Sequence, residues 1–363
     1  MSVQKKRAFS LSAALITLAL VSACSSPVTE PNGEAPEGNG ATDVDFCAAP
    51  LNDEPVSISF SGPIEGFAPL LLAVESGAFE AAGIDLSLER VPAADSLAQM
   101  GQGRLDGQWS SYSASHMNAV GAGIEMIWVA PSYEMPSMTV TQQMPGFWAN
   151  VKYVGTGPEP DLSGLVGQTV GTPTRGTAVD GWVLAQALEA QGLSYGDVAY
   201  AQMSGADSLA ALENDAVAAA WLSGPLDQQA YDNPNLRLIA TYNTGLNGSG
   251  LIVGPSFLEK PEVLTKFLQV IAETSAKYLQ GDYHNDDEVV DMLSNAIGQE
   301  PTMIKASVPL IFDATLDLSN GAAYINGLQE FTRTNVGLDY ADNLSASSFF
   351  DASFARDAAS CLD

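Results

Sequence analysis

The stretch VSISFSGPIEGFAPLLLAVESGAFEAAGIDLSL, at residues 56–88, decides the fold class. Apolar and polar side chains alternate at residues 56–60 and again at 84–88, which is typical of strands that bury one face. Between them lie a turn-rich loop and an apolar segment that Pro69 opens and that ends near Gly83, which predicts a helix. This strand–helix–strand order predicts an α/β protein with a parallel sheet and right-handed crossovers.

Strands and helices continue to alternate after residue 88. Further strands are predicted near residue 108 and at 125–130, 168–171, 198–202 and 216–222, with two short ones within 236–253. Helices are predicted at 69–83, 96–100, 113–120, 177–190, 209–213, 261–280, 287–297, 302–308, 322–332 and 345–354. Thr177 is the expected N-cap of the helix at 177–190. Because ligands on parallel sheets collect at the carboxyl ends of strands, we expect the loops there to form the binding site.

The first 24 residues have the three parts of an export signal. Residues 5–7 are basic, residues 8–20 form an apolar run, and residues 21–24, VSAC, end in small side chains. The run is shorter than the roughly 20 apolar residues that a membrane-crossing helix needs. The last four residues resemble a bacterial lipobox, which predicts that Cys24 begins the mature protein and carries a lipid anchor; the alternative is ordinary cleavage near Ala23.

Residues 24–45 are rich in Ser, Pro, Gly, Glu, Asn and Thr and nearly free of large apolar side chains, which predicts a flexible tether. The rest of the chain is longer than the roughly 250–300 residues at which a single core tends to divide, so we expect two lobes. Acidic residues outnumber basic ones by 43 to 14, and this excludes a nucleic-acid partner because phosphate binding depends on clusters of Lys and Arg.

Three cysteines and two histidines limit the chemistry that this chain supports. If Cys24 carries a lipid, Cys47 and Cys361 are the remaining pair, and a disulfide between them is expected in an oxidising compartment. His116 and His284 are the two histidines and lie far apart in the sequence, so a hydrolytic triad or a histidine zinc site is not expected. The composition therefore favours binding over catalysis, with no cofactor and no metal.

Six segments carry a family resemblance. They are FAPLLLAVESGAFEAAGIDL at 67–86, LAQMGQGRLD at 97–106, AVGAGI at 119–124, LVGQTVG at 165–171 with RGT at 175–177, AALENDAVAAAWLSGP at 210–225 and FLEKPEV at 257–263. Their order and spacing resemble the ABC-importer solute-binding proteins of the sulfonate, taurine, nitrate and thiamine-precursor group. Asp215 and Ala218 depart from the pattern, since the family more often has Gly and Asp there.

The resemblance implies a two-lobed periplasmic-binding-protein type II fold that closes on a small molecule. It implies a signal peptide at 1–23, a tether at 24–45, lobe 1 at 46–137 plus 247–363, and lobe 2 at 138–246. The implied partners are the permease and ATPase subunits of an importer. The binding protein is expected to be a monomer that a lipid anchor holds outside the cytoplasm. The alternatives are an extracytoplasmic sensor or adhesin of the same fold and a pyrimidine-synthase-like enzyme, which would need reactive His and Cys clusters.

Loops at the strand ends are expected to line the cleft. Glu65 would meet an ammonium group or be solvated, Trp109 would contact the ligand or pack in the core, and Arg175 would receive an anion or be an ordinary surface side chain. The expected ligand-binding residues are Ser61, Glu65, Phe67, Trp109, Ser111, Tyr112, Ser113, Tyr133, Ser137, Arg175, Gly176, Thr177 and Trp221.

The sequence leaves two ligand classes open. A sulfonate, taurine or nitrate-like anion would use Arg175 and the helix start behind it, whereas an aromatic heterocycle such as a thiamine precursor would stack on Trp109, Tyr112 and Trp221. Few basic and many aromatic residues favour an organic molecule with an apolar or ring portion. The acidic run at 286–288 lacks the spacing of a calcium loop and is read as a helix start.

Overall fold

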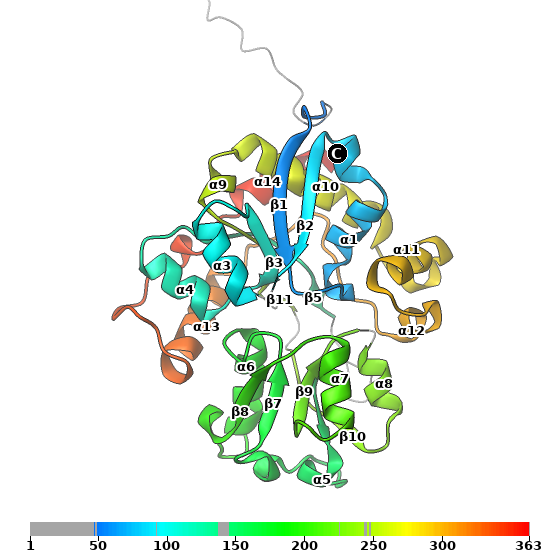
Figure 1. The fold of residues 1–363 in the computed structure, drawn as a ribbon, viewed down its shortest axis with the longest axis vertical. Helices are drawn as coiled ribbons and strands as arrows, with labels where there is room; N and C mark the ends of the chain where they lie inside the picture. Colours follow the sequence, from blue (N-terminus) through cyan, green and yellow to red (C-terminus); the bar gives the residue numbers. More distant parts are fainter. Residues whose placement is uncertain are drawn as a thin grey trace, which may run out of the picture. The chain divides into compact units, whose positions relative to one another are not determined.

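Two five-stranded sheets frame the protein, one in each lobe (Figure 1). A computed structural model describes residues 47, 49–91, 93–136, 145–224, 226–242, 245–246 and 248–362. The predicted signal at 1–23, Cys24 with the tether at 24–45, and Ser137 lie outside the described residues. In the described part, no helix is both long enough and apolar enough to span a bilayer.

The sheet of lobe 1 has the strand order β2-β1-β3-β12-β4. Its strands are β1 (Glu54–Phe60), β2 (Ile84–Arg90), β3 (Gly107–Ser111), β4 (Ile127–Pro131) and β12 (Ser249–Val253). β1 lies parallel to both β2 and β3, and Phe60 stands opposite Arg90 on one side and Trp109 on the other. The loops after these three strands therefore leave the same edge of the sheet.

The sheet of lobe 2 has the order β10-β6-β9-β7-β8. Its strands are β6 (Gly146–Asn150), β7 (Thr169–Thr172), β8 (Ala199–Gln202), β9 (Ala219–Leu222) and β10 (Leu236–Thr241). β7 lies parallel to β8 and β9, and β6 runs antiparallel to β9 and β10. Thr172 ends β7 opposite Gln202 at the end of β8, so the loops after these two strands also leave one edge.

The α/β class is confirmed, but the prediction of a parallel sheet is wrong at one strand in each lobe. β12 runs antiparallel to β3 and β4, as β6 does to its neighbours. Each of these strands follows a passage of the chain from one lobe to the other, so it enters its sheet without the helical crossover that parallel pairing requires. β5 (Glu134–Met135) and β11 (Gly245–Leu246) pair on the two connecting passages.

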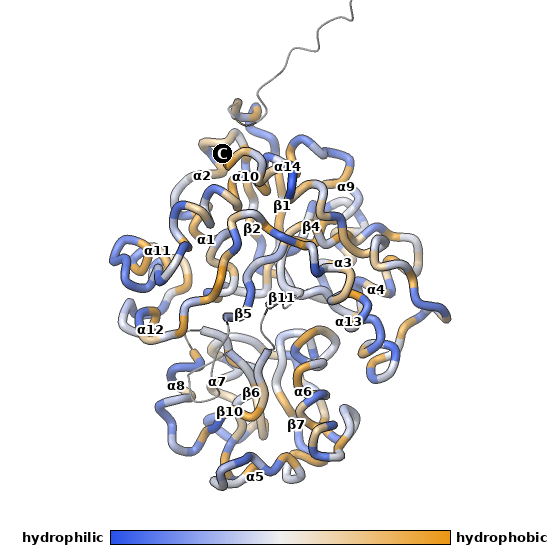
Figure 2. The backbone as a smooth tube through the Cα atoms, turned by 180° about the vertical axis from the view of Figure 1, so that it is seen from behind, coloured by the Kyte–Doolittle hydropathy of each residue, from blue (hydrophilic) through white to orange (hydrophobic). Residues whose placement is uncertain are grey.

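Helices cover both sheets, and hydrophilic and apolar residues alternate along outer helices such as α11 (Figure 2). Lobe 1 has α1 (Ala68–Glu75), α2 (Ala78–Ala81), α3 (Ala93–Gly101), α4 (Ala114–Gly121), α9 (Pro255–Leu258), α10 (Pro261–Tyr278), α11 (Asp287–Ile297), α12 (Pro301–Ala306), α13 (Gly321–Asn335) and α14 (Ser353–Ala359). Lobe 2 has α5 (Val151–Val154), α6 (Val179–Glu189), α7 (Ala206–Glu213) and α8 (Leu226–Asp232). The 3-10 turns are η1 (Glu65–Phe67), η2 (Leu162–Leu165), η3 (Tyr195–Asp197), η4 (Tyr283–Asn285), η5 (Ala346–Ser348) and η6 (Ser360–Leu362).

Three predicted helices differ from the observed ones. The helix at 69–83 is divided into α1 and α2 by Gly77, whose φ of 71° ends a right-handed helix. The N-cap of α6 is Ala178, because the Thr177 hydroxyl donates to the carbonyl of Thr174 instead of capping the helix. The helix at 345–354 is reduced to η5 and the start of α14, because Phe350 forms a β-bridge with Trp128.

Aromatic side chains join the two lobes on one side of the molecule. The ring of Trp182 in α6 lies 5.9 Å from that of Tyr324 and 6.4 Å from that of Phe331, both in α13. Tyr195 of lobe 2 meets Phe331 edge-on at 5.5 Å. These contacts belong to one apolar cluster that continues into the cores of both lobes, so the lobes pack directly on each other.

Cys47 is joined to the C-terminal end of the chain within lobe 1. Cys47 and Cys361 form a disulfide with their Cα atoms 5.3 Å apart, which is the pairing that the sequence predicts. The carbonyl oxygen of Cys47 also accepts hydrogen bonds from Lys266 and Gln269 in α10. These contacts fix the position of Cys47 on lobe 1.

Candidate functional site

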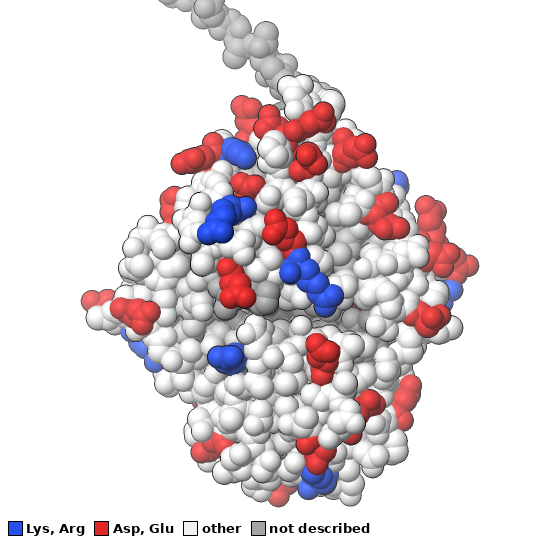
Figure 3. Space-filling view, viewed as in Figure 1, with Lys and Arg blue, Asp and Glu red and all other residues white. Residues whose placement is uncertain are grey.

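A cavity of about 210 Å³ lies between the lobes and is called the Arg90 cavity below. The surface is hollowed along the boundary between the lobes (Figure 3). Lobe 1 supplies the loop at 61–64, Arg90 at the end of β2, Ile297 at the end of α11 and Gln299 after it. Lobe 2 supplies Pro173, Ser204, Gly205, Ala206, Trp221, Ser223, Gly224 and Leu226. The cavity is thus formed by strand-end loops from both sheets.

A second cavity of about 330 Å³, called the Arg175 cavity, also has walls from both lobes. It is lined by Ser111, Ser113 and Ser115 of lobe 1 and by Thr174, Arg175, Thr177 and Gln202 of lobe 2. The backbone N–H of Ala114 donates to the carbonyl oxygen of Thr177 at 3.0 Å, which joins the lobes beside this cavity.

Neither lining contains an acidic side chain, although the chain has 43 Asp and Glu residues. Both linings contain an arginine, and in the described part the side chains of Arg90 and Arg175 form no hydrogen bond or ion pair with another residue. The other described Lys and Arg side chains do have partners: carboxylates for Lys152, Lys260, Lys305 and Arg356, neutral oxygens for Arg104, Arg237, Lys266 and Arg333, and the Tyr278 ring for Lys277. The two free guanidinium groups therefore both lie at cavities between the lobes.

The loop that carries Arg175 is held by hydrogen bonds. The N–H of Gly176 donates to the Thr172 hydroxyl at 2.7 Å, and the hydroxyl of Tyr195 donates to the carbonyl of Gly176 at 3.0 Å. The Thr174 hydroxyl donates to Asp180, a buried carboxyl in the first turn of α6 whose pKa is raised mainly by burial. Arg175 itself has a φ of 57°, which is uncommon outside glycine. Its backbone is therefore fixed by its neighbours.

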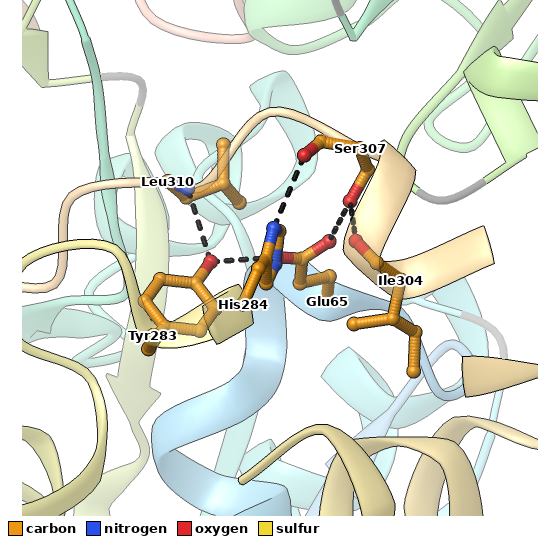
Figure 4. A network of polar contacts seen from close by, with 6 residues as sticks. All are labelled: Glu65, Tyr283, His284, Ile304, Ser307 and Leu310. Atoms are coloured by element: carbon orange, nitrogen blue, oxygen red, sulfur yellow. Dashed lines mark hydrogen bonds and ion pairs between the residues drawn. The ribbon is translucent and has the colours of Figure 1, made fainter. Parts of the chain in front are cut away.

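Glu65 lies in a buried polar network of lobe 1 (Figure 4). Its Oε1 atom is 2.6 Å from the hydroxyl of Tyr283 and 2.6 Å from Nε2 of His284, and its Oε2 atom is 3.1 Å from the hydroxyl of Ser307. The backbone N–H of Leu310 donates to the Tyr283 oxygen, so the phenol hydrogen is directed at Glu65. Burial is the main cause that raises the pKa of Tyr283 well above its ordinary value.

One shared proton makes the Glu65–His284 pair neutral as a whole. Nδ1 of His284 faces the carbonyl of Ser307 at 3.1 Å, so this nitrogen carries a hydrogen. Between Nε2 and Oε1 one further proton is needed, because two lone pairs would otherwise meet at 2.6 Å. Wherever that proton lies, the charges of the two groups sum to zero, so Glu65 adds no net charge beside the cleft.

His116 supports the start of α4 from within lobe 1. Its Nδ1 accepts the Ser113 N–H at 3.1 Å, and its Nε2 lies 3.0 Å from Oε1 of Gln108. Burial lowers the pKa of His116 to about 4, so the ring is neutral near pH 7. It fixes the position of Ser113 in the wall of the Arg175 cavity.

The structure brings six of the predicted site residues to the two cavities: Ser61, Ser111, Ser113, Arg175, Thr177 and Trp221. It places Phe67, Trp109 and Tyr112 in the cores, where the Trp109 ring donates to Ser132 and the Tyr112 hydroxyl donates to the Met126 carbonyl. Glu65, Tyr133 and Gly176 are also buried, with Tyr133 packed against Gly66.

Several lining residues were missed by the sequence interpretation, among them Arg90, Ser115, Gln202, Ser204 and Gln299. Arg90 ends the strand at 84–90 and Gln202 ends that at 199–202, so the rule that ligands gather at strand ends already pointed to both. Gln299 follows a helix, and no strand pattern marks it. Within the described residues, no group of His, Cys, Asp and Glu is arranged to hold a metal ion.

Solved structures of binding proteins share this fold. The alkanesulfonate-binding protein SsuA from Xanthomonas axonopodis pv. citri bound to MOPS has a TM-score of 0.60 and 16% identity, over 84% of this chain and 100% of that chain. The periplasmic nitrate-binding protein NrtA from Synechocystis PCC 6803 has a TM-score of 0.64 and 15% identity, over 87% and 90%. The periplasmic aliphatic sulphonate binding protein SsuA from Escherichia coli has a TM-score of 0.54 and 18% identity, over 78% and 93%.

At these identities the likeness shows the fold alone, and it confirms the predicted two-lobed periplasmic-binding-protein fold. Among proteins with curated descriptions, none matches the chain by sequence. Residues 65–281, more than half of the chain, match the family described as NMT1/THI5 like. The match begins at η1, after the loop at 61–64, and extends beyond the end of α10, so it includes parts of both lobes. The chain therefore belongs to the NMT1/THI5-like family.

Proposed function

We propose that the protein is the substrate-binding component of an ABC importer and captures a small organic anion between its lobes. The observation that carries this proposal is the pair of free arginines, each facing an interlobe cavity whose lining has no Asp or Glu. The chain has a net charge of -29, but at physiological salt charges beyond roughly 8 Å are largely screened, so the local groups decide. The names of the similar structures, which bind sulfonates and nitrate, support an anion.

An aromatic heterocycle such as a thiamine precursor is the alternative ligand. Of the three rings expected to stack on it, Trp221 lines a cavity, whereas Trp109 and Tyr112 are buried in the cores. One ring at a cavity offers less stacking than three would, and this favours the anion.

We also propose the cellular setting that the sequence predicts. The lipid on Cys24 holds the protein outside the cytoplasm, and residues 24–45 let it reach the permease, which works with an ATPase subunit. Residues 46–137 plus 247–363 and residues 138–246 are the two bodies that close on the solute, and the protein acts as a monomer. A sensor or adhesin of this fold would bind a ligand without a permease partner.

A pyrimidine-synthase-like enzyme receives no support from the cavities. Both histidines are buried in hydrogen-bonded positions of lobe 1, and the described cysteines form a disulfide. No histidine or cysteine is among the residues that line either cavity. We therefore assign binding and not catalysis to this cleft.

A ligand screen tests the proposal. The purified chain is heated with alkanesulfonates, taurine, nitrate, bicarbonate, pyrimidines or flavins, and hits are confirmed by calorimetry. A ligand at 100 times its dissociation constant adds about 2.7 kcal/mol of stability. The expected result is stabilisation by anions; stabilisation by pyrimidines alone would favour the aromatic alternative, and no binding by any of these compounds would contradict transport of this solute class.

A further inference from the structure

The guanidinium group of Arg90 lies against the loop that opens the cleft. A Cβ atom placed on Gly62 would come within 3.0 Å of Nη2 of Arg90 and 3.4 Å of Cζ. The backbone of Gly62, with a φ of 156°, therefore leaves room for the guanidinium to lie over the loop at 61–64. This places the positive charge in the wall of the Arg90 cavity without a carboxylate to neutralise it.

The two arginine cavities differ in their apolar content. The Arg90 cavity has Ile64, Leu226 and Ile297 together with the ring of Trp221 in its walls. The Arg175 cavity is lined by Ser, Thr and Gln side chains beside its arginine. Small-molecule sites are mostly apolar with a few placed polar groups, so the Arg90 cavity fits an organic solute and the Arg175 cavity does not.

We propose that Arg90 binds the anionic group of the solute and that the apolar part of the solute lies against Trp221, Leu226 and Ile297. The solute is therefore an organic acid with one anionic end and an aliphatic or aromatic body. This inference rests on the proposed function, because it names the residue and the ligand class of that same cleft. It makes Arg90 a specificity-determining residue, in place of Arg175.

The electrostatic setting agrees with this assignment. A Cβ atom on Gly224 in the lobe 2 wall would lie 2.9 Å from Oε2 of Glu65 and 3.9 Å from Oδ1 of Asp227. Nε2 of His284 lies 2.6 Å from Oε1 of Glu65, so this carboxyl has a buried partner in lobe 1. The hydroxyls of Ser61, Ser204 and Ser223 line the same cavity and supply hydrogen-bond donors to the anion.

The test compares Arg90→Gln with Arg175→Gln, a matched pair that removes one guanidinium from each cavity. Calorimetry measures the dissociation constants of ethane-, butane- and hexanesulfonate, with butanol as the neutral analogue. We expect Arg90→Gln to weaken sulfonate binding about 10- to 100-fold and Arg90→Lys to restore part of it, since a hydrogen-bonded charge is lost and then returned. Arg175→Gln should change the affinity by less than about threefold.

Chain length provides a second readout. If the body of the solute lies in the Arg90 cavity, affinity should rise up to roughly fourfold with each added methylene until the cavity is full. The assignment would be overturned if Arg175→Gln lost sulfonate binding and Arg90→Gln kept it, or if the affinity did not change with chain length. Either result would leave the proposed function intact. No sulfonate binding by the wild-type chain would instead count against the proposed function itself.

Discussion

The backbone N–H of Ala114 donates a 3.0 Å hydrogen bond to the carbonyl oxygen of Thr177, and the bond crosses from lobe 1 to lobe 2. Ala114 is the first residue of α4, and Thr177 precedes α6. Thr177 and Ser113, the residue before Ala114, are both predicted ligand-binding residues. The bond thus joins two walls of the cleft directly and stabilises the arrangement in which the lobes touch.

Ala114→Pro should remove this bond with little damage to α4. Proline is accepted at the first position of a helix, and Ser113 before it is extended, with a φ of -137° and a ψ of 170°. We expect a loss of about 0.5–1.5 kcal/mol in the free energy of closure, seen as a two- to tenfold weaker ligand affinity in calorimetry.

Ala114→Ser keeps the N–H group and is the matched control for that change. An equal loss of affinity in both variants would show that side-chain packing, and not the interlobe bond, is responsible.

Gly224→Ala should hold the lobes apart. The added Cβ atom would lie 2.9 Å from Oε2 of Glu65, which is fixed by Tyr283, His284 and Ser307 on the other lobe. We expect a larger radius of gyration in small-angle X-ray scattering with ligand present, and an affinity reduced about tenfold, which corresponds to roughly 1.4 kcal/mol.

The control for this prediction is Gly196→Ala, because a Cβ atom at Gly196 meets nothing within 4 Å. Unchanged scattering for Gly224→Ala would mean that Glu65 or its loop moves aside to make room.

The sequence predicts most of the strands and helices of this protein, because strand alternation and helix length are local properties. It fails where a distant partner decides the conformation. Phe350 leaves the predicted helix because it bridges to Trp128, and β12 is reversed because the chain returns from lobe 2.

The candidate site is predicted less completely than the strands and helices. The loops after the strands are identified from the sequence, but a loop does not reveal which of its side chains face the cavity. Trp109 and Ser111 are two residues apart in β3; the tryptophan packs in the core and the serine lines a cavity. The hydrogen-bond partners of Glu65 could not be predicted from the sequence either, because Tyr283, His284 and Ser307 lie more than 200 positions away.

Glu65→Ala should strongly destabilise lobe 1. It leaves the Tyr283 hydroxyl and Nε2 of His284 buried without their acceptor, and breaking a buried pair by removing one partner costs about 3–5 kcal/mol. Urea unfolding measures the loss as a lower midpoint.

Glu65→Gln keeps one acceptor and should cost less. Glu75→Ala, at an exposed position of the adjacent α1, is the matched control and should change stability by less than about 0.5 kcal/mol. A loss of similar size at Glu65 and Glu75 would contradict the role assigned to the network.

His116 should make the protein less stable as the pH falls. Burial lowers its pKa in the folded state to about 4, below the ordinary value of 6.5. The unfolded chain therefore binds the extra proton first, so stability is lost as the pH drops from about 6.5 to about 4, by roughly 3 kcal/mol in total. The check is to compare urea midpoints of wild type and His116→Gln across this range: the difference between them should shrink toward low pH, and a constant difference would contradict the neutral buried ring.

Removing the Cys47–Cys361 disulfide should lower stability without affecting the cleft. The bond joins residues 314 positions apart, and closing so long a loop in the unfolded chain is worth about 2–5 kcal/mol in stability. Replacing both cysteines with serine should therefore lower the melting temperature in oxidising buffer. A reductant should lower the melting temperature of the wild type to a similar value and leave that of the double variant unchanged.

Ligand affinity should stay within about twofold of wild type, because neither cysteine lines an interlobe cavity. A large loss of affinity would show instead that the ends of lobe 1 control the shape of the cleft, since the disulfide joins these ends and Lys266 of α10 donates to the carbonyl of Cys47.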